Sequence, residues 1–386
     1  MKRTLTLSFF LLATICLQAQ GIKGNVRIGL LTSLYLDSSF DASGNYKLQK
    51  NFPKQAVGGL EFYEGASLAI DSLNKMGYLA TMKVFDLQSK ERNITALAKS
   101  GELDKLNVLI SYTGGTEYLE LATLAKEKSI PLINANYPND GGIRNSPTVF
   151  IANPKINSHL TVIYNQIVKK WPEAKIIWFK RNDPGDDRLL TIFNDQNTIS
   201  KKLKFSTAIL SPGFTTNDLS LHLDSTKMNI LIAGSIDDGF AGDFARAIMN
   251  YPKKGIIQLI GMPNWEGLKE IQNKAFTGIP VHYTSGYFAS SGNKWLADYD
   301  EMFKVNTGTK ASTASIRGFE LTYFFGSLWA KKGSLDHQQF SDPSLRIVTD
   351  YDFRPVFWNM ENQKPDYFEN KRIYFIRRLN GVASLQ

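Results

Sequence analysis

Hydrophobic residues along this chain follow two alternating periodicities for nearly its whole length. Short apolar runs, which are typical of buried strands, are followed by segments whose apolar residues recur three and four positions apart, as in amphipathic helices. The order begins with a strand at 26–31 and a helix at 60–73, and it restarts with a strand at 175–180. Because strands that alternate with helices form parallel sheets, the pattern predicts the α/β class, with two doubly wound, Rossmann-like lobes and a ligand cleft.

The end of the chain changes character, and this change guides the expected division into domains. Two long helical stretches, at 294–304 and 313–332, are followed by alternating segments that predict a β-hairpin-like tail. With 386 residues, the chain is too long for one ordinary hydrophobic core. We therefore expect two discontinuous lobes. Lobe 1 is expected to comprise 21–153 plus 285–332, and lobe 2 to comprise 154–284 plus 333–386.

The segment 107–134 contains the clearest candidate for a binding site. A buried strand pattern stops at a turn with two hydroxyls and two glycines, an amphipathic helix follows, and a second strand ends the unit. The first backbone N–H groups of a helix have no internal partner and carry partial positive charge. A glycine-containing turn lets an anionic group approach them closely. The pattern therefore predicts a cradle for a carboxylate or phosphate at Thr113, Gly114, Gly115 and Thr116.

The segment 1–20 has the pattern of an export signal. A basic start at Lys2 is followed by a mostly apolar stretch that is shorter than the roughly 20 residues a bilayer-spanning helix needs. Small or polar residues at Ala19 and Gln20 suit a cleavage point. We therefore expect this segment to be a removed signal peptide and the protein to be periplasmic or otherwise exported. An uncleaved anchor is the alternative, and the short apolar run argues against it.

Cysteine usage and charge narrow the class further. Cys16 is the only cysteine and lies inside the expected signal. Ile15 before it is a poor fit to the small residue that a lipidation motif needs, so lipoprotein anchoring is not expected. Once Cys16 is removed, disulfides and thiolate chemistry are both excluded. The formal net charge is +9, but the basic residues are dispersed in pairs without interleaved aromatics, so nucleic acid is not an expected partner.

Motifs of enzymes and metal sites have no counterpart in the sequence. It contains no G-x-S-x-G turn, no P-loop and no H-E-x-x-H motif. The four histidines are widely scattered, without the spacing of metal ligands. We therefore expect a protein that is not an enzyme and that uses neither a metal nor a cofactor. A hydrolase on an α/β scaffold is the remaining enzymatic alternative.

Five segments follow one another in a recognisable order: VRIGLLTSL, FYEGASLAIDSLN, MKVFDLQS, VLISYTGGTEYLELATLAKEKSIPLIN and ILIAGSIDDGFAGDFARAI. Together they resemble the type I periplasmic solute-binding proteins, whose fold is that of branched-chain amino-acid receptors. The first three resemble the first strand, first helix and second strand of that family. The fourth resembles its third strand, ligand turn, helix and fourth strand, and the fifth a ligand-facing loop of the second lobe. The resemblance covers essentially the chain after the signal.

The resemblance implies a receptor that holds a small polar solute between two lobes, for uptake by an ABC-type transporter or for sensing. The small-molecule ligand would be amino-acid-like or otherwise anion-bearing, and an inner-membrane permease or envelope partner is implied with it. The first lobe would hold a carboxylate, and acidic residues of the second would take an ammonium group. The implied ligand-binding residues are Ser33, Tyr35, Thr113, Gly114, Gly115, Thr116, Asn134, Asn136 and Tyr137 in the first lobe, and Asn182, Asp183, Ser235, Asp237 and Asp238 in the second.

Each candidate also has a structural interpretation, and the function has an alternative. The segment 37–59 is longer than in plain amino-acid receptors, so an envelope scaffold or regulator that keeps the fold without a transported ligand is the alternative function. The threonines of the turn and Asp237 can cap helices, and the two tyrosines and Trp265 can serve packing alone. Asp86, at the end of a strand, can bind the backbone of the first helix.

Overall fold

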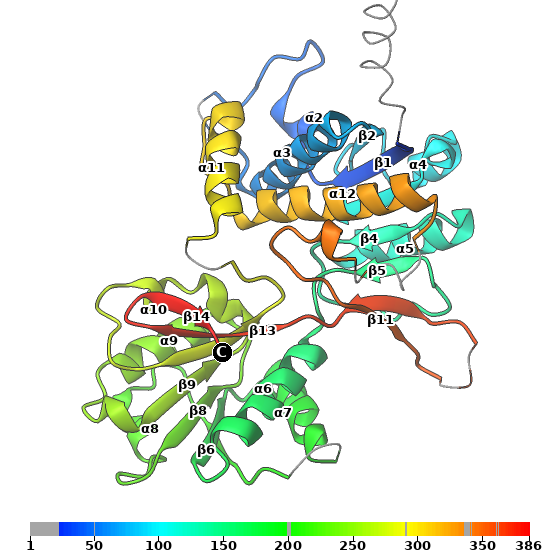
Figure 1. The fold of residues 1–386 in the computed structure, drawn as a ribbon. Coiled ribbons are helices and arrows are strands. Elements are labelled where there is room, and N and C mark those ends of the chain that lie inside the picture. Colours follow the sequence, from blue (N-terminus) through cyan, green and yellow to red (C-terminus); the bar gives the residue numbers. More distant parts are fainter. Residues whose placement is uncertain are drawn as a thin grey trace, which may run out of the picture. The chain divides into compact units, whose positions relative to one another are not determined.

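The computed structural model describes residues 23–49, 51–198, 202–289, 292–335, 340, 342–359, 361 and 363–386. The expected signal peptide 1–20, with Cys16, lies outside these residues. The chain forms two compact units and passes from one to the other three times (Figure 1). Unit 1 comprises Met1–Asn153 and Lys294–Asn370, and unit 2 comprises Pro154–Asn293 and Lys371–Gln386.

Unit 1 is built on a seven-stranded sheet with the order β11-β12-β5-β4-β3-β1-β2. The central strands are short runs of buried apolar residues, as expected for parallel strands that are covered on both faces. All neighbouring strands are parallel except β11 and β12, which are antiparallel. The strands are β1 Asn25–Thr32, β2 Leu79–Asp86, β3 Val108–Tyr112, β4 Leu132–Asn134, β5 Val149–Ile151, β11 Phe353–Val356 and β12 Tyr367–Asn370.

Helices α3 and α12 of unit 1 pack directly against each other (Figure 1). A Cβ atom on Gly65 would lie 1.8 Å from the carbonyl oxygen of Ser315, and one on Gly318 would lie 2.1 Å from that of Phe62. Only glycine permits so close an approach of two backbones. The helices of this unit are α2 Leu36–Ser39, α3 Lys54–Lys75, α4 Ile94–Ser100, η1 Leu103–Lys105, α5 Gly115–Lys128, α11 Lys294–Thr307, α12 Thr313–Lys332 and η6 Pro343–Leu345.

Unit 2 has a second seven-stranded sheet, with the order β14-β13-β10-β9-β8-β6-β7. It is parallel from β7 to β10, and β13 and β14 extend it as antiparallel strands. Its strands are β6 Lys175–Lys180, β7 Ser206–Ile209, β8 Asn229–Ala233, β9 Ile257–Gly261, β10 Val281–Ser285, β13 Tyr374–Leu379 and β14 Val382–Leu385. Its helices are α6 Ile156–Lys170, α7 Pro184–Asp195, η2 Gln196–Thr198, α8 Thr216–Ser220, α9 Asp238–Met249, η3 Lys254–Ile256, η4 Pro263–Gly267 and α10 Lys269–Gln272.

Both sheets reverse their strand order once. In unit 1 the chain runs from β1 outward to β2 and then returns to β3, β4 and β5 on the other side of β1. In unit 2 it runs from β6 outward to β7 and returns to β8, β9 and β10. Ligands of such folds bind outside the carboxyl ends of the strands at this reversal. The loops after β1 and β3, and those after β6 and β8, are therefore the places where a site is expected.

The tail of the chain divides differently from the sequence prediction. The alternating pattern places 333–386 in lobe 2, but 333–370 belongs to unit 1. The reason is that β12 pairs with β5, with Phe368 opposite Phe150. The predicted hairpin is instead two antiparallel pairs, one in each sheet. The short segment 285–293, predicted in lobe 1, belongs to unit 2. A period of two predicts a strand, but the sheet it joins depends on contacts distant in sequence.

The segment 37–59, predicted as an irregular loop, is partly helical. It contains most of the short helix α2 and the first turns of α3, which begins at Lys54. Phe40 and Tyr46 in this segment contact each other edge to face, with ring centroids 5.4 Å apart.

No helix among the described residues is both long enough and apolar enough to cross a bilayer.

Candidate functional site

An open hollow of about 530 Å³ lies at the carboxyl ends of the strands of unit 1, beside the strand reversal. Small-molecule sites typically have volumes of about 300–1,000 Å³. The loops after β1, β2, β3 and β4 all contribute to this hollow, together with the first turns of α3. The lining residues are Ser33, Tyr35, Gln55, Gly58, Gly59, Gln88, Tyr112, Thr113, Gly114, Gly115, Thr116, Glu117 and Asn136.

The turn between β3 and α5 brings backbone N–H groups to this hollow. Gly114 is the residue before the helix, and no side chain caps the helix there. Gly115 has a φ of +56°, a left-handed conformation that glycine adopts without strain. The interpretation of the turn threonines as helix caps is therefore wrong. The first N–H groups of α5 have no acceptor within the helix.

Of the two threonines in this turn, Thr113 is the buried one. It is 6% exposed and lines the hollow. Among the described residues, its hydroxyl has no hydrogen-bond partner. The oxygen itself is not among the fully buried side-chain oxygens without a partner, so it keeps contact with solvent in the hollow. The group is therefore ready to bond a solute that enters the hollow, whereas Thr116 is exposed at its rim.

Asp86 fixes the two loops that form the opposite wall. Its carboxylate accepts hydrogen bonds from the backbone N–H groups of Leu34 (2.9 Å), Tyr35 (3.3 Å) and Leu36 (2.8 Å). It also accepts one from the N–H of Gln88 at 3.0 Å. Tyr35 has a φ of +56°, which is uncommon outside glycine, and these bonds hold it there. The prediction that Asp86 binds the backbone of the first helix, the helix at 60–73, is wrong: its partners lie in the loops after β1 and β2 and at the first residue of α2.

The hollow also contains an acidic group that the sequence analysis did not select. The side-chain amide of Gln88 donates to Ser33 Oγ and to Glu117 Oε1, each at 3.3 Å. Glu117 lies in the first turn of α5, where an acidic residue also interacts favourably with the helix dipole. In sequence it reads as an ordinary helix-start residue, so only the bond to Gln88 marks it as part of the site.

The residues after β4 divide between shaping the loop and lining the hollow. Asn134 is fully buried; its side chain donates to the carbonyl of Tyr137 at 2.7 Å and accepts from its N–H at 2.9 Å. The ring of Tyr137 packs against Tyr118, with centroids 5.4 Å apart. Neither Asn134 nor Tyr137 lines the hollow, whereas Asn136 does. Asn134 therefore holds the turn, and of these three Asn136 is the one placed to contact a solute.

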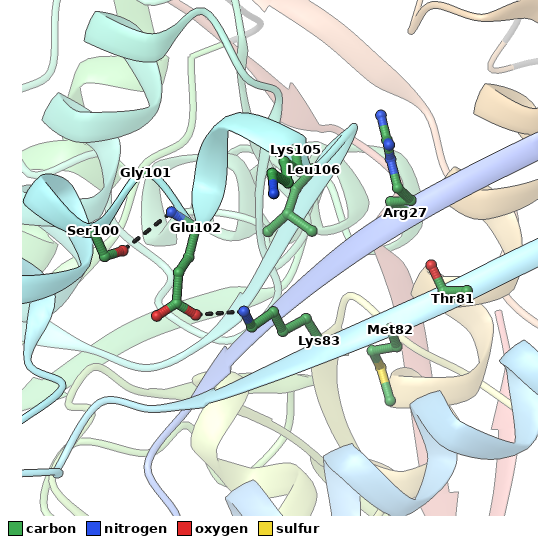
Figure 2. Close-up of a pocket in the computed structure, with 9 residues that line it drawn as sticks. All are labelled: Arg27, Thr81, Met82, Lys83, Ser100, Gly101, Glu102, Lys105 and Leu106. Carbon is green, nitrogen blue, oxygen red and sulfur yellow. Dashed lines mark hydrogen bonds and ion pairs between the residues drawn. The ribbon is translucent and has the colours of Figure 1, made fainter.

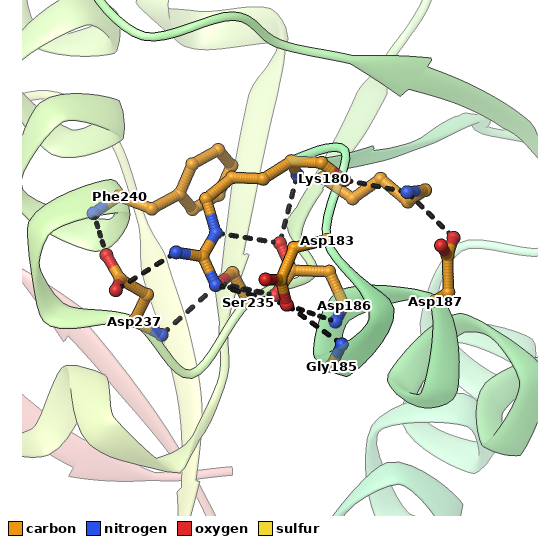
Figure 3. Close-up of polar contacts among 9 residues, drawn as sticks. Lys180, Asp183, Gly185, Asp186, Asp187, Ser235, Asp237 and Phe240 are labelled. Atoms are coloured by element: carbon orange, nitrogen blue, oxygen red, sulfur yellow. Dashed lines mark hydrogen bonds and ion pairs between the residues drawn. The ribbon is translucent and has the colours of Figure 1, made fainter.

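The corresponding edge of unit 2 is organised around Arg181, which the sequence analysis did not select. Its guanidinium donates to both carboxylate oxygens of Asp186, at 3.1 Å each. It also pairs with Asp237 at 3.0 Å and with Asp183 at 3.7 Å. Ser235 adds a bond of 2.8 Å to Asp186. Figure 3 shows the carboxylates of Asp183, Asp186 and Asp237 turned toward one another; they come from the loop after β6, the first turn of α7 and the loop after β8.

The charges of this cluster support one another. Asp186 is 1% exposed, and burial opposes its ionisation. The hydrogen bonds from Arg181 and Ser235 outweigh that effect and hold the pKa of Asp186 below its usual value. The bond to Asp186 in turn raises the pKa of Arg181. The cluster is therefore a stable ion pair in which a buried carboxylate already has its cation.

The predicted residues of unit 2 all lie near this cluster, but most have structural partners. Asp183 caps α7 through the N–H of Gly185 at 2.8 Å. Asp237 caps α9 through the N–H of Phe240 at 2.7 Å, which confirms its interpretation as an N-cap. Asp238 is exposed and accepts a hydrogen bond of 2.9 Å from the amide of Asn264, and Asn182 is exposed. Ser235 and Trp265 are fully buried.

A second hollow of unit 1, of about 420 Å³, lies away from the strand reversal (Figure 2). Arg27, near the start of β1, and Lys105 line it, and Lys83 forms an exposed ion pair with Glu102. Exposed lysines and arginines of this kind are common on protein surfaces, and the amino-terminal halves of β1 and β2 are not where this fold class binds ligands. Elsewhere among the described residues, no group of three or more His, Cys, Asp or Glu side chains is placed to hold a metal ion.

Comparisons with known proteins identify the architecture. No protein-family model and no curated protein matches the sequence. Solved structures do match, over 94% of this chain. A Rhodospirillum rubrum protein described as a branched-chain amino acid ABC transporter is 11% identical, with all of its chain covered and a TM-score of 0.68. A branched-chain amino acid ABC transporter periplasmic ligand-binding protein from Burkholderia xenovorans is 12% identical, with 94% of its chain covered and a TM-score of 0.61.

A third match carries a ligand. The branched-chain amino acid transporter substrate-binding protein LivJ from Streptococcus pneumoniae, solved in complex with isoleucine, is 14% identical, with 99% of its chain covered and a TM-score of 0.53. The chain has the type I periplasmic binding protein fold. The resemblance seen in the sequence is thus confirmed at the level of the fold.

The type I periplasmic binding protein fold explains where the sequence-predicted residues meet. In unit 1, Ser33, Tyr35, Asn136 and the turn 113–116 line one hollow, although they come from three separate loops. The structure adds Gln88 and Glu117 to them. Gln88 lies just after Asp86, the last residue of β2, so its position at the end of a strand could have suggested it as a candidate. Nothing in the sequence distinguishes Glu117 from an ordinary acidic residue at a helix start.

Proposed function

We propose that this chain is an exported solute-binding receptor, and not an enzyme, whose first unit holds the anionic group of a small, amino-acid-like ligand. The anion would lie at the turn 113–116. The observation that carries the proposal is the hollow itself: it lies at the strand reversal and contains an uncapped helix start and the nearly buried Thr113, whose hydroxyl bonds no other described residue.

The chemistry of this turn suits a carboxylate. The uncapped N–H groups of α5 point along a helix dipole whose amino end attracts negative charge. A carboxylate has two oxygens, so it can accept from these N–H groups and from the hydroxyl of Thr113 at once. Hydrogen bonds to a charged group contribute about 1.5–3 kcal/mol each.

The neighbours of known structure support the ligand class. They are described as substrate-binding proteins of ABC transporters, and in two of the solved structures the ligand is isoleucine or leucine. We extend this to an amino-acid-like solute for the present chain, with an inner-membrane permease or an envelope sensor as the partner. Export follows from the expected signal 1–20. Mass spectrometry of the native protein should show a mature chain that begins near Gly21; an intact Met1, or a lipid on Cys16, would contradict export with signal removal.

The scaffold alternative has one observation in its favour. The carboxylates of unit 2 that were expected to take a ligand ammonium group, Asp183 and Asp237, are already engaged by Arg181 and by helix N–H groups. A unit that fills its own acidic edge in this way is what a protein without a transported solute would show. The role of unit 2 in ligand binding therefore stays a prediction.

A thermal-shift screen tests the receptor proposal. A ligand that binds only the folded state raises the apparent stability by about 2.7 kcal/mol at a concentration one hundred times its Kd. The screen should cover the twenty L-amino acids, dipeptides and sugars at millimolar concentration, and we expect at least one amino acid to raise the melting temperature by several degrees. If no member of the panel does so, the scaffold function is favoured.

The variant Gly114→Val locates the site. A Cβ on Gly114 would lie 3.7 Å from the ring of Tyr137, an ordinary contact, and the φ of −142° is one that valine adopts readily. The variant should therefore fold but obstruct the hollow and abolish the shift. Gly255→Val is the matched control, because a Cβ on Gly255 in unit 2 meets nothing within 4 Å. Equal binding by both variants would place the site elsewhere.

A further inference from the structure

The hollow of unit 1 contains one carboxylate that has no cation. Glu117 lines the hollow and is partly buried. Within the described part of the chain it forms no ion pair, and its one side-chain hydrogen bond is that from Gln88 to Oε1. An amide donor orients a carboxylate without neutralising it. Oε2 therefore keeps its full accepting capacity beside the turn that suits an anion.

The orientation of Glu117 is built into the fold. The N–H of Gln88 is bonded to Asp86, and its amide reaches Ser33 on one side and Glu117 on the other. Three loops are thereby linked, those after β1, β2 and β3. A side chain that served only the helix dipole would need no such partner. The arrangement is that of a group held in place to contact something in the hollow.

In contrast to Glu117, the acidic residues at the corresponding edge of unit 2 already have a guanidinium or helix N–H groups as partners. Asp186 and Asp237 are paired with Arg181 at 3.0–3.1 Å, and Asp183 caps a helix. A ligand cation would have to compete there with a guanidinium that is already bound through several hydrogen bonds. Glu117 offers a negative charge without such a competitor.

We propose that Glu117 is the acceptor for the ammonium group of the ligand. Unit 1 alone would then recognise both charges of an α-amino acid: the carboxylate at the turn 113–116 and the ammonium group at Glu117. This inference rests on the proposed function and deepens it, because it selects zwitterions over plain carboxylic acids. Thr113 is the independent sign that the hollow receives a polar group, because it is 6% exposed, lines the hollow and has a hydroxyl that bonds no other described residue.

Matched pairs of probes test the inference by calorimetry. The pairs are L-alanine with L-lactate, L-serine with L-glycerate, and L-leucine with L-2-hydroxy-4-methylpentanoate. In each pair a hydroxyl replaces the ammonium group and the carboxylate remains. We expect the wild-type protein to bind at least one of these amino acids, about ten- to one-hundred-fold more tightly than its partner, as for a lost charge-assisted hydrogen bond. Glu117→Gln should remove this preference by weakening the amino acid alone.

The control is Glu120→Gln, which removes the same charge from an exposed position of α5. It should bind both members of each pair as the wild type does. If Glu117→Gln keeps the preference, or if the wild type has none while still binding the acids, the role of Glu117 is wrong and the proposed anion site stands. If another amino acid gives the largest thermal shift, it and its 2-hydroxy acid form a further pair; if no pair binds and no amino acid raises the melting temperature, both the inference and the amino-acid-like ligand are wrong.

Discussion

The two units present similar edges to solvent but leave different groups unpaired. In unit 1 the loops after β1 and β3 expose helix N–H groups and contain the unpaired hydroxyl of Thr113. In unit 2 the loops after β6 and β8 contain more charge, yet Arg181 and the helix starts use nearly all of it. The more strongly charged edge is therefore the one with less binding capacity left over.

This difference shows that the residue types in a loop are a weak guide to binding. Asp237 and Glu117 are both carboxylates near the start of the helix that follows corresponding strands, β8 and β3, of the two sheets: Asp237 is the residue before α9, and Glu117 lies in the first turn of α5. Asp237 caps its helix and pairs with a guanidinium, whereas Glu117 has only an amide partner. What a carboxylate can bind depends on the cations and N–H groups that already surround it. Four changes test this comparison, in order of decreasing expected effect.

Replacing Arg181 should produce the largest loss of stability. Arg181→Met leaves the carboxylate of Asp186, which is 1% exposed, without its cation. Removing one partner of a buried ion pair costs about 3–5 kcal/mol, and the partial exposure of Arg181 places the expected loss near the lower end. Urea unfolding measures it. Arg188→Met on the exposed face of α7 is the control and should change little. An unchanged midpoint for Arg181→Met would mean that the cluster contributes no stability.

The pH dependence should differ between the units. Burial lowers the pKa of His159 to about 4 and, with Lys170 and Arg377, that of His282 to about 3; both lie in unit 2. An unfolded histidine titrates near 6.5, so below that pH the unfolded chain binds protons that unit 2 cannot, and stability is lost as the pH falls toward 4. Between pH 6.5 and 5.5 the two histidines should remove about 2 kcal/mol.

Glu320 in unit 1 should contribute in the opposite direction as the pH falls through its raised pKa. Burial raises the pKa of Glu320, despite bonds from the N–H groups of Val348 and Thr349, so its protonation favours the folded state as the pH falls. Hydrogen exchange, corrected for the intrinsic pH effect, can follow β8–β10 and β1–β3 separately. His282→Phe should reduce the loss in unit 2 by about half. Equal loss of protection in both units would show that these histidines do not determine the difference.

Removing Asp86 should disturb unit 1 less than removing Arg181 disturbs unit 2. Asp86→Ala takes the acceptor from four backbone N–H groups, but most of these lie close to the surface and can bond water instead. We expect a loss of about 1.5 kcal/mol, together with weaker binding in the hollow, because Ser33 and Gln88 are no longer fixed. Thermal unfolding with Asp71→Ala, on the exposed face of α3, as the control measures the difference. Binding that is unaffected would separate Asp86 from the site.

Much of this architecture could be predicted from the sequence, because it depends on local patterns. The apolar runs of β6 and β8 and the turn after β3 are visible in any short window. The sheet that β12 joins could not be predicted, because its partner β5 lies more than two hundred residues away in sequence. Alternation with a period of two predicts a strand but does not specify which strand it pairs with. The glycine-containing turn before a helix predicted the site at 113–116, and the family resemblance added Ser33; both line one hollow.

The partners of charged residues could not be predicted in the same way. Arg181 stands beside Asn182 and Asp183 in sequence and reads as a solvated loop residue, yet its main partner Asp186 is on the first turn of α7 and another, Asp237, comes from a different strand end. Glu117 reads as a helix-start acid, and its partner Gln88 follows another strand. Such pairs arise only when the sheet brings strand ends together.

The substitution Thr113→Val should have the smallest effect on stability, and it tests most specifically whether the hollow of unit 1 binds a solute. Thr113→Val removes a hydroxyl that contacts solvent and forms no hydrogen bond to another described residue, so the stability of the empty protein should change by less than about 0.5 kcal/mol. Binding of L-leucine, or of whichever probe amino acid binds, should weaken by about tenfold, because the carboxylate loses one donor. A hydroxyl that held the turn through a hydrogen bond would instead cost about 0.5–1.5 kcal/mol of stability when it is removed. Thr123→Val, which removes a hydroxyl bonded to Leu119 farther along the same helix, should leave binding unchanged. If Thr113→Val destabilises the protein and binds the amino acid normally, Thr113 is structural and the hollow does not use it.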